Sequence, residues 1–151
     1  DVVMGGASSS NFDGATGKWK GSVTDSNNGG FVGIRSTPFV NYDMSSCKGI
    51  RLKLTCKIPS RLKVVVRDST EFNGVGWTTS ANIGNNRNVD IPFAKQVPTK
   101  FAKTVEGETF SKDNVKGFQL VYSKFEYDGA LNPKFKVGDI DVQVEEISAY
   151  Q

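Results

Sequence analysis

Four carboxylates gather near the C-terminal end of the sequence: Asp139, Asp141, Glu145 and Glu146. Two such groups facing each other across a cleft could cleave a glycosidic bond as acid and nucleophile, and their oxygens could also hold a calcium ion. Asp139 and Asp141 are two residues apart, however, and therefore share one face of a strand. We favour a solvent-exposed strand face with no catalytic residue and no metal.

Histidine is absent from the chain, so neither a Ser-His or Cys-His nucleophile pair nor an imidazole metal site can form. Two cysteines are too few for a cysteine-only zinc site. The Gly5-Gly6 and Gly29-Gly30 pairs fit neither phosphate-loop pattern. We therefore predict a protein that is not an enzyme and carries no cofactor. An enzyme that uses the C-terminal carboxylates is the least favoured alternative.

The segment between Cys47 and Cys56 alternates polar and apolar residues, as a half-buried strand does. An extended backbone of this length spans roughly 30 Å, whereas a disulfide requires Cα atoms within about 7 Å. We therefore expect two free thiols, with Cys56 buried in phase with Ile50, Leu52 and Leu54. Free thiols and the lack of an Asn-x-Ser/Thr sequon favour a reducing compartment.

Alternating polarity predicts short strands and almost no helix along the rest of the chain. The last predicted strand, residues 135–150, changes its two-residue period twice, which predicts bulges near Gly138 and near Glu145-Glu146. Asn28-Gly29 predicts a tight turn between two of the strands. The irregular stretch is residues 93–116, with one helical turn near residues 111–114. The other predicted strands cover residues 17–24, 30–36, 48–55, 61–68, 75–79, 88–91 and 117–123.

About eight or nine short strands with glycine-rich turns predict an all-β fold, an antiparallel β-sandwich or jelly roll. The length of 151 residues suits one domain that spans residues 1–151. The sequence starts inside a motif, so we expect residues upstream of Asp1. No apolar run approaches the roughly 20 residues that span a bilayer, and we expect a protein that does not span a membrane.

The net charge is +3, and the basic residues are scattered. Nucleic-acid binding requires a basic patch interleaved with exposed aromatic residues, or a recognisable module. Neither is found, so we expect no nucleic-acid partner.

Exposed aromatic residues are another route to a binding site. Sugar-binding sandwiches use such rings as flat apolar platforms, and Trp77 follows a glycine-rich turn. If the solvent face of the strand 61–68 forms a groove, we predict that Arg67, Trp77 and Gln119 line it. The reading that we favour for Trp77 is burial between the sheets together with Trp19, because large aromatic residues are mostly buried.

Several motifs resemble those of a known family. Residues 1–10 resemble the Asp-x-x-Met-Gly-Gly-x-Ser signature of the complex I intermediate-associated protein family, the thirty-kilodalton one. Residues 21–36 resemble its second block, residues 90–93 its "iPF" element, and residues 140–150 its closing strand. The blocks occur in order and cover nearly the whole chain. The signature residues, structural or binding, are Asp1, Met4, Gly5, Gly6, Ser8, Asn28, Gly29, Gly30 and Arg35.

The resemblance implies a galactose-binding-like jelly roll, in agreement with the strand pattern. It also implies a role in assembling respiratory complex I in mitochondria, and similar domains occur in cyanobacteria and plastids, one of them in a protein that supports photosystem II biogenesis. We therefore expect an assembly factor or scaffold, soluble or peripheral, that docks on protein subunits of a membrane-associated electron-transport or light-harvesting complex. The mitochondrial matrix and the plastid stroma or thylakoid surface are the expected locations.

Loops on a rigid sandwich commonly carry recognition, so we predict that residues 95–113 form part of the docking interface. The alternative function is a carbohydrate-binding module, which the implied fold and Trp77 motivate.

Overall fold

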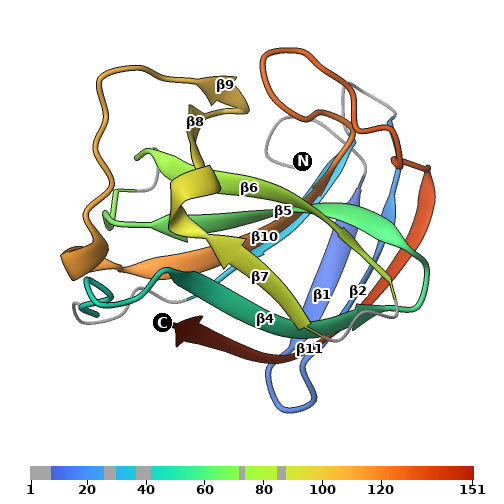
Figure 1. The fold of residues 1–151 in the computed structure, drawn as a ribbon. Helices are drawn as coiled ribbons and strands as arrows, with labels where there is room; N and C mark the ends of the chain where they lie inside the picture. Colours follow the sequence, from blue (N-terminus) through green and yellow to red (C-terminus); the bar gives the residue numbers. More distant parts are fainter. Residues whose placement is uncertain (1–7, 26–29, 37–41, 72–73, 85–87) are drawn as a thin grey trace.

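The computed structural model describes residues 8–25, 30–36, 42–71, 74–84 and 88–151. In this part of the chain the strands form two sheets, and every strand pairing is antiparallel. Figure 1 shows the two sheets packed face to face. The predicted antiparallel β-sandwich is confirmed. Among the described residues, no helix has the length and the apolar character needed to cross a membrane.

The five-stranded sheet has the order β1 (Ser9–Asp13), β2 (Lys18–Val23), β11 (Gly138–Tyr150), β4 (Gly49–Cys56) and β7 (Asn88–Pro92). The register between β11 and β4 shifts between Val144 and Glu146, so the bulge predicted there is confirmed. The bulge predicted near Gly138 is wrong. Gly138 is the first residue of β11, with a φ of +132°, so the change of period marks the start of the strand.

The six-stranded sheet has the order β3 (Phe31–Arg35), β10 (Gly117–Ser123), β5 (Ser60–Arg67), β6 (Gly76–Ile83), β8 (Val97–Lys100) and β9 (Lys103–Thr104). Two short 3₁₀ turns, η3 (Phe93–Lys95) and η4 (Lys112–Asn114), flank β8 and β9 along the chain. The stretch predicted to be irregular thus contains a hairpin. Its strands are too short for their polarity pattern to reveal them.

The strands on either side of Asn28-Gly29 do not pair with each other. β2 lies in the five-stranded sheet and β3 in the six-stranded one, so the chain crosses between sheets here. Residues 26–29 themselves lie outside the described part of the chain. Alternation identifies the buried face of each strand but not its neighbours, which is why the sequence could not predict this crossing.

The core lies between the sheets and is built from the alternating apolar residues of β4 and β5. Leu52, Leu54, Leu62 and Val64 have no exposed surface. Burying each such side chain stabilises the fold by roughly 1.5–3 kcal/mol. Cys56 joins this core, and both cysteines are free, as predicted.

Candidate functional site

The polar residues of the predicted groove meet on the outer face of the six-stranded sheet, the face directed away from the core. Arg67 on β5 donates from Nη1 to Oε1 of Gln119 on β10, at 3.4 Å. Arg35 on β3 is the register partner of Gln119. The other terminal nitrogen of Arg67 donates to the carbonyl oxygens of Glu71 at 3.4 Å and Gly74 at 3.3 Å. Arg35, Arg67 and Gln119 therefore form one polar surface.

Trp77 lies on the other side of this sheet. Its register partner is Val66, which belongs to the core, and Trp77 itself is only 7% exposed. The indole ring is 5.4 Å from the ring of Phe110, centroid to centroid. Trp77 thus packs between the sheets, as the favoured reading had it, and does not share the face of Arg67 and Gln119. Trp19 is likewise fully buried.

A shallow hollow of about 30 Å³ opens between Arg35 and Arg67. Gly117 on β10 is the register partner of Arg67, and because it has no side chain, space remains above β10 between β3 and β5. Burial lowers the pKa of Arg67, and the nearby charge of Arg35 lowers that pKa further. Burial also lowers the pKa of Arg35. The two guanidinium groups are therefore close; Arg67 is buried, whereas Arg35 is exposed.

Two further signature residues have structural roles. Ser8 is 1% exposed; its hydroxyl donates to the carbonyl oxygen of Thr24 at 3.0 Å and accepts the Thr24 N–H at 2.9 Å. Gly30 has a φ of +122°, a conformation that favours glycine, and its carbonyl oxygen accepts the Lys124 N–H at 2.7 Å. Arg35 lines the hollow. The other signature residues lie outside the described part of the chain: Asp1, Met4, Gly5, Gly6, Asn28 and Gly29.

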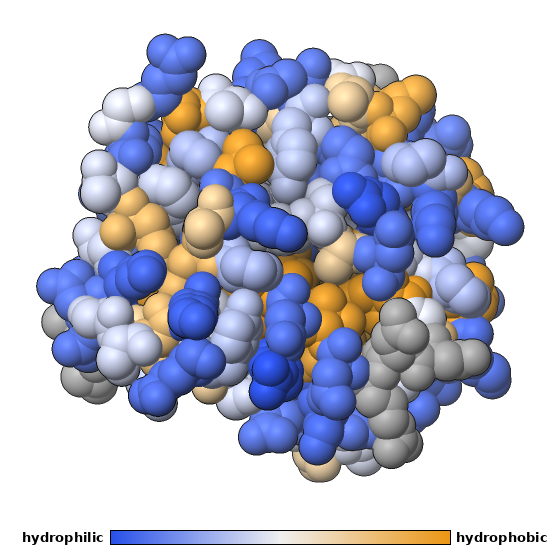
Figure 2. Space-filling model, viewed as in Figure 1, coloured by the Kyte–Doolittle hydropathy of each residue, from blue (hydrophilic) through white to orange (hydrophobic). Residues whose placement is uncertain are grey.

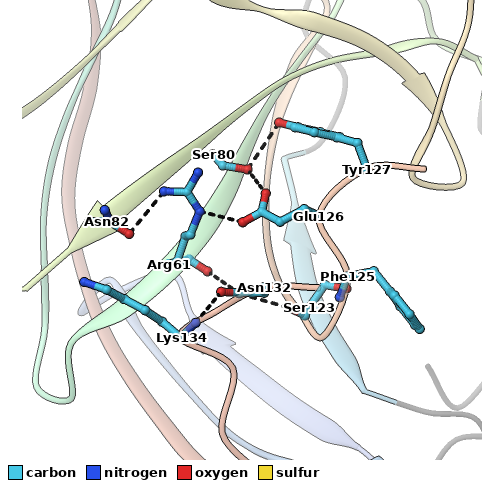
Figure 3. A network of polar contacts seen from close by, with 9 residues as sticks. All are labelled: Arg61, Ser80, Asn82, Ser123, Phe125, Glu126, Tyr127, Asn132 and Lys134. Atoms are coloured by element: carbon cyan, nitrogen blue, oxygen red, sulfur yellow. Dashed lines mark hydrogen bonds and ion pairs between the residues drawn. The ribbon is translucent and has the colours of Figure 1, made fainter. Parts of the chain in front are cut away.

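A loop of residues 124–132, which follows β10, folds over the outer face of the six-stranded sheet (Figure 3). Glu126 accepts a hydrogen bond from Arg61 Nε at 2.5 Å and another from the Ser80 hydroxyl. The hydroxyl of Tyr127 lies 3.2 Å from that of Ser80, and the Tyr127 ring lies 5.5 Å from the ammonium nitrogen of Lys63. This network ties the loop to β5 and β6. No residue spacing in the sequence predicted this network.

Asn132 anchors the far end of the same loop. Its side-chain amide donates to the carbonyl oxygens of Arg61 at 3.1 Å and Ser123 at 3.0 Å, and its side-chain oxygen accepts the Lys134 N–H at 2.9 Å. Asn132 is 7% exposed. Because buried polar groups must be paired, these bonds fix the loop in one conformation.

The turn between β8 and β9 is held against this loop. Lys100 pairs with Lys103, and the two residues between them, Phe101 and Ala102, have φ of 50° and 59°, the signature of a type I′ turn. Asp128, with a φ of 54°, donates its N–H to the carbonyl oxygen of Ala102 at 2.8 Å. The Asp128 carboxylate accepts from the N–H of Thr104 at 2.8 Å and from its hydroxyl at 2.7 Å.

These three are the non-glycine residues with positive φ in the described part of the chain, and they meet at one junction. Backbone of this kind is strained. The bonds from Thr104 lower the pKa of Asp128, because they stabilise its ionised carboxylate.

Three large apolar side chains are exposed on these two loops: Phe101 at 76%, Phe125 at 41% and Leu131 at 61%. Phe125 and Leu131 are partners in an isolated antiparallel bridge, and the Asp128 junction joins their loop to the turn that carries Phe101. We call this set the rim surface. Figure 2 shows hydrophilic residues over most of this side of the molecule, with hydrophobic residues in smaller patches between them.

The C-terminal carboxylates lie along β11. Asp141 lies 3.9 Å from Lys20 Nζ in a partly exposed ion pair on the outer face of the five-stranded sheet, and Asp139, Glu145 and Glu146 are exposed. This agrees with the predicted solvent-exposed strand face. The described residues contain no group of three or more acidic or cysteine side chains arranged to hold a metal.

The fold is similar to those of solved carbohydrate-binding modules. The family 11 module from Clostridium thermocellum, solved with a β-1,3-1,4-mixed-linked tetrasaccharide, superposes with a TM-score of 0.60 at 16% identity, covering 95% of this chain and 82% of that one. The same type of module from the Clostridium thermocellum cellulosomal cellulase Lic26A-Cel5E gives 0.59 at 17% identity, covering 95% and 81%. No curated protein matches the chain significantly.

A family model matches almost the whole sequence. It is the model of complex I intermediate-associated protein 30 (CIA30), and it covers residues 1–144 of the 151. Its extent includes the signature residues, the loops of the rim surface and every strand except the last six residues of β11. The chain belongs to the CIA30 family.

Proposed function

We propose that this chain is a non-catalytic assembly factor or scaffold that docks through the rim surface on protein subunits of a large membrane-associated complex. The family is named for association with complex I intermediates, which supports complex I as the partner. A photosynthetic electron-transport or light-harvesting complex is the other partner of this class. The protein then works in an organelle interior, the mitochondrial matrix or the plastid stroma, free or peripheral to the membrane.

The observation that carries this proposal is the conformation of Phe101. An aromatic residue at positive φ is unfavourable for folding, and a glycine or asparagine would suit the turn better. Strain of this kind is typically stored at functional sites. Here it holds a ring that is 76% exposed at the tip of a turn that Asp128 and Thr104 lock. The side chain is displayed to solvent rather than used in the core.

A rigid display favours binding, because little conformational entropy remains to be lost when the partner docks. Aromatic residues often dominate the binding energy of an interface, and Phe101 and Phe125 are the candidates here. A stable interface must bury roughly 1,000 Å² or more. The rim surface and the remaining residues of the two loops that carry it would supply this area. Residues 95–113, the interface predicted from the sequence, contribute β8, β9 and Phe101.

The test is native size fractionation of detergent-solubilised organelle membranes, following the chain by mass spectrometry. We expect the wild-type protein to travel with a large complex and a Phe101→Asp variant to travel near its own 16.4 kDa. A Lys53→Asp variant on the opposite, outer face of the five-stranded sheet is the matched control and should behave as wild type. A wild-type protein that fractionates alone would contradict the proposal.

A carbohydrate-binding module is the second candidate, which the likeness to the family 11 modules favours. On this chain the sugar would lie on the outer face of the six-stranded sheet, beside Gln119 and the half-buried ring of Tyr127. Titration with β-1,3-1,4-linked oligosaccharides tests it, with Gln119→Ala as the variant. Trp77→Ala is unsuitable because Trp77 is part of the core. If the calorimetric titration of the wild-type protein shows no heat of binding, the carbohydrate-binding function is excluded.

A further inference from the structure

We propose that the hollow between Arg35, Arg67 and Lys116 is a binding site for a phosphate group. These three basic residues belong to the seven that line it, and none of the seven, all within the described part of the chain, is acidic; the other four are Ser36, Ser69, Thr70 and Gly117. The site is separate from the rim surface. The inference therefore does not depend on the docking proposal.

The strand register brings the cations together. Arg35 pairs with Gln119 on β10, and Arg67 pairs with Gly117, two residues earlier on that strand. Both arginines therefore project from the same outer face, two strands apart, on either side of the position where Gly117 has no side chain. The Lys116 N–H donates to the carbonyl oxygen of Arg67 at 2.7 Å, which fixes the backbone that carries the third cation.

Two hydroxyl groups at the hollow are already oriented. Ser36 Oγ accepts the N–H of Phe118 at 2.9 Å, and Ser69 Oγ accepts the N–H of Glu71 at 3.0 Å. An accepting hydroxyl still has its own proton to donate. The site therefore offers O–H donors beside N–H donors, which is the combination that an oxyanion with several oxygens requires.

The charge of the site favours phosphate over a carboxylate. A phosphate monoester carries a charge of about −1.5 to −2 at neutral pH, whereas a carboxylate offers one charge to three cations. The planar guanidinium group matches phosphate geometry with two parallel hydrogen bonds. A volume of about 30 Å³ accommodates roughly two water-sized oxygens, so a phosphate would enter with two oxygens and leave its ester oxygen at the surface.

The two arginine charges lie close enough to repel each other, and this repulsion favours the binding of an anion beside them. The charge of Arg35 lowers the pKa of Arg67, and a bound phosphate would relieve that repulsion. Asp68 acts on Arg67 in the opposite direction and less strongly than burial and Arg35. The Asp68 carboxylate accepts the Ser111 N–H at 3.0 Å and does not line the hollow.

The experiment is an NMR titration of the wild-type chain with inorganic phosphate at constant ionic strength and neutral pH, following the amide signals of Ser36 and Gly117. We expect saturable shifts at both. Arg35 is exposed and Lys116 partly exposed, and the variants Arg35→Gln and Lys116→Gln should each raise the dissociation constant about tenfold, the effect of one lost charge-assisted hydrogen bond. Lys53→Gln, which removes a charge from the other sheet, is the control and should match the wild type.

A second arm identifies the source of the phosphate by sedimentation with phosphatidylcholine vesicles, with and without phosphatidic acid. Binding that requires phosphatidic acid and is lost in Arg35→Gln would support the site with a lipid headgroup as the ligand. Binding of inorganic phosphate without vesicle binding would support it with a free phosphate compound. Two results would overturn the proposal: chemical shifts that do not saturate with phosphate, or a loss of affinity in Lys53→Gln as large as that in Arg35→Gln. Either result would show that the phosphate is attracted by the overall charge and not by this site.

Discussion

Arg61 and Glu126 form an ion pair across 2.5 Å, from Nε to Oε1, with their side chains 28% and 13% exposed. The pair joins β5 to the 124–132 loop, which is separated from it by a long stretch of sequence. Ser80 on β6 also donates a hydrogen bond to Glu126, and Asn132 in the loop donates one to the carbonyl oxygen of Arg61. The position of the rim surface therefore depends on a polar network rather than on apolar packing.

Glu126→Gln should destabilise the protein by about 1–3 kcal/mol. The variant keeps the shape of the side chain but leaves the partly buried guanidinium of Arg61 without its charged partner. Denaturant unfolding measures the change. The matched control is Asp90→Asn, which removes the exposed pair of Arg51 and Asp90 on the other sheet and should change stability by less than about 1 kcal/mol. Equal effects of the two substitutions would show that the network does not hold the loop.

The double variant Phe101→Asn, Ala102→Gly should be more stable than the wild type and bind its partner less well. Asn-Gly is the preferred sequence for a turn with two positive φ angles, so relief of the strain should raise stability by about 1 kcal/mol. Calorimetry measures the first effect and native fractionation the second. A variant that gains stability and still travels with the complex would show that Phe101 has no role in docking.

Stability should fall between pH 9 and about 11 because of Cys56. Burial raises the pKa of this thiol from 9.0 to about 11, and the charge of Asp141 adds to the shift. Between pH 9.0 and about 11 the unfolded chain loses the thiol proton while the folded chain keeps it. The stability that the protonated, buried thiol gives the fold is therefore complete below pH 9 and is lost as the pH rises through the folded pKa. Other groups also titrate here. The measurement is therefore the difference between the wild type and Cys56→Ala across this range, and parallel curves would contradict the prediction.

Trp77→Ala should cost about 3–5 kcal/mol, as is typical of large core aromatic residues. The ring packs on Phe110, which in turn packs on Phe93 at 5.1 Å. Trp77→Phe should be much milder, because the indole nitrogen has no hydrogen-bond partner among the described residues and only ring volume is lost. Urea unfolding of the two variants checks this order. Similar small losses for both would place Trp77 outside the core.

Most of the fold could be predicted from the sequence, because half-buried strands carry their period in the chain itself. Leu52 and Leu54 alternate with exposed residues, and the bulge near Glu146 was visible as a change of parity. The pairing of strands that are distant in the chain produces no such pattern in the sequence. The crossing from β2 to β3 was therefore missed, and the short β8 and β9 offered too few residues for a pattern.

The candidate site was predicted only in part. Arg67 and Gln119 were both assigned to the solvent face of a strand, and their side chains are in contact on that face; their part in a ligand groove stays a prediction. Trp77 was included because it is aromatic and follows a glycine-rich turn, and its pairing with the core residue Val66 places it on the other face. The contacts that build the rim surface, such as Thr104 with Asp128, join loops whose approach depends on the complete fold. No periodicity or residue spacing in a single sequence indicates contacts of this kind.

The most direct test of the docking surface is site-specific photo-crosslinking in intact organelles, with a photoreactive residue at position 101, 131 or 53. We predict that positions 101 and 131, both on the rim surface, capture the same protein subunit of a membrane-associated complex, and that position 53, on the opposite sheet, captures none. Capture from position 53 alone, or no adduct from positions 101 and 131, would contradict the account.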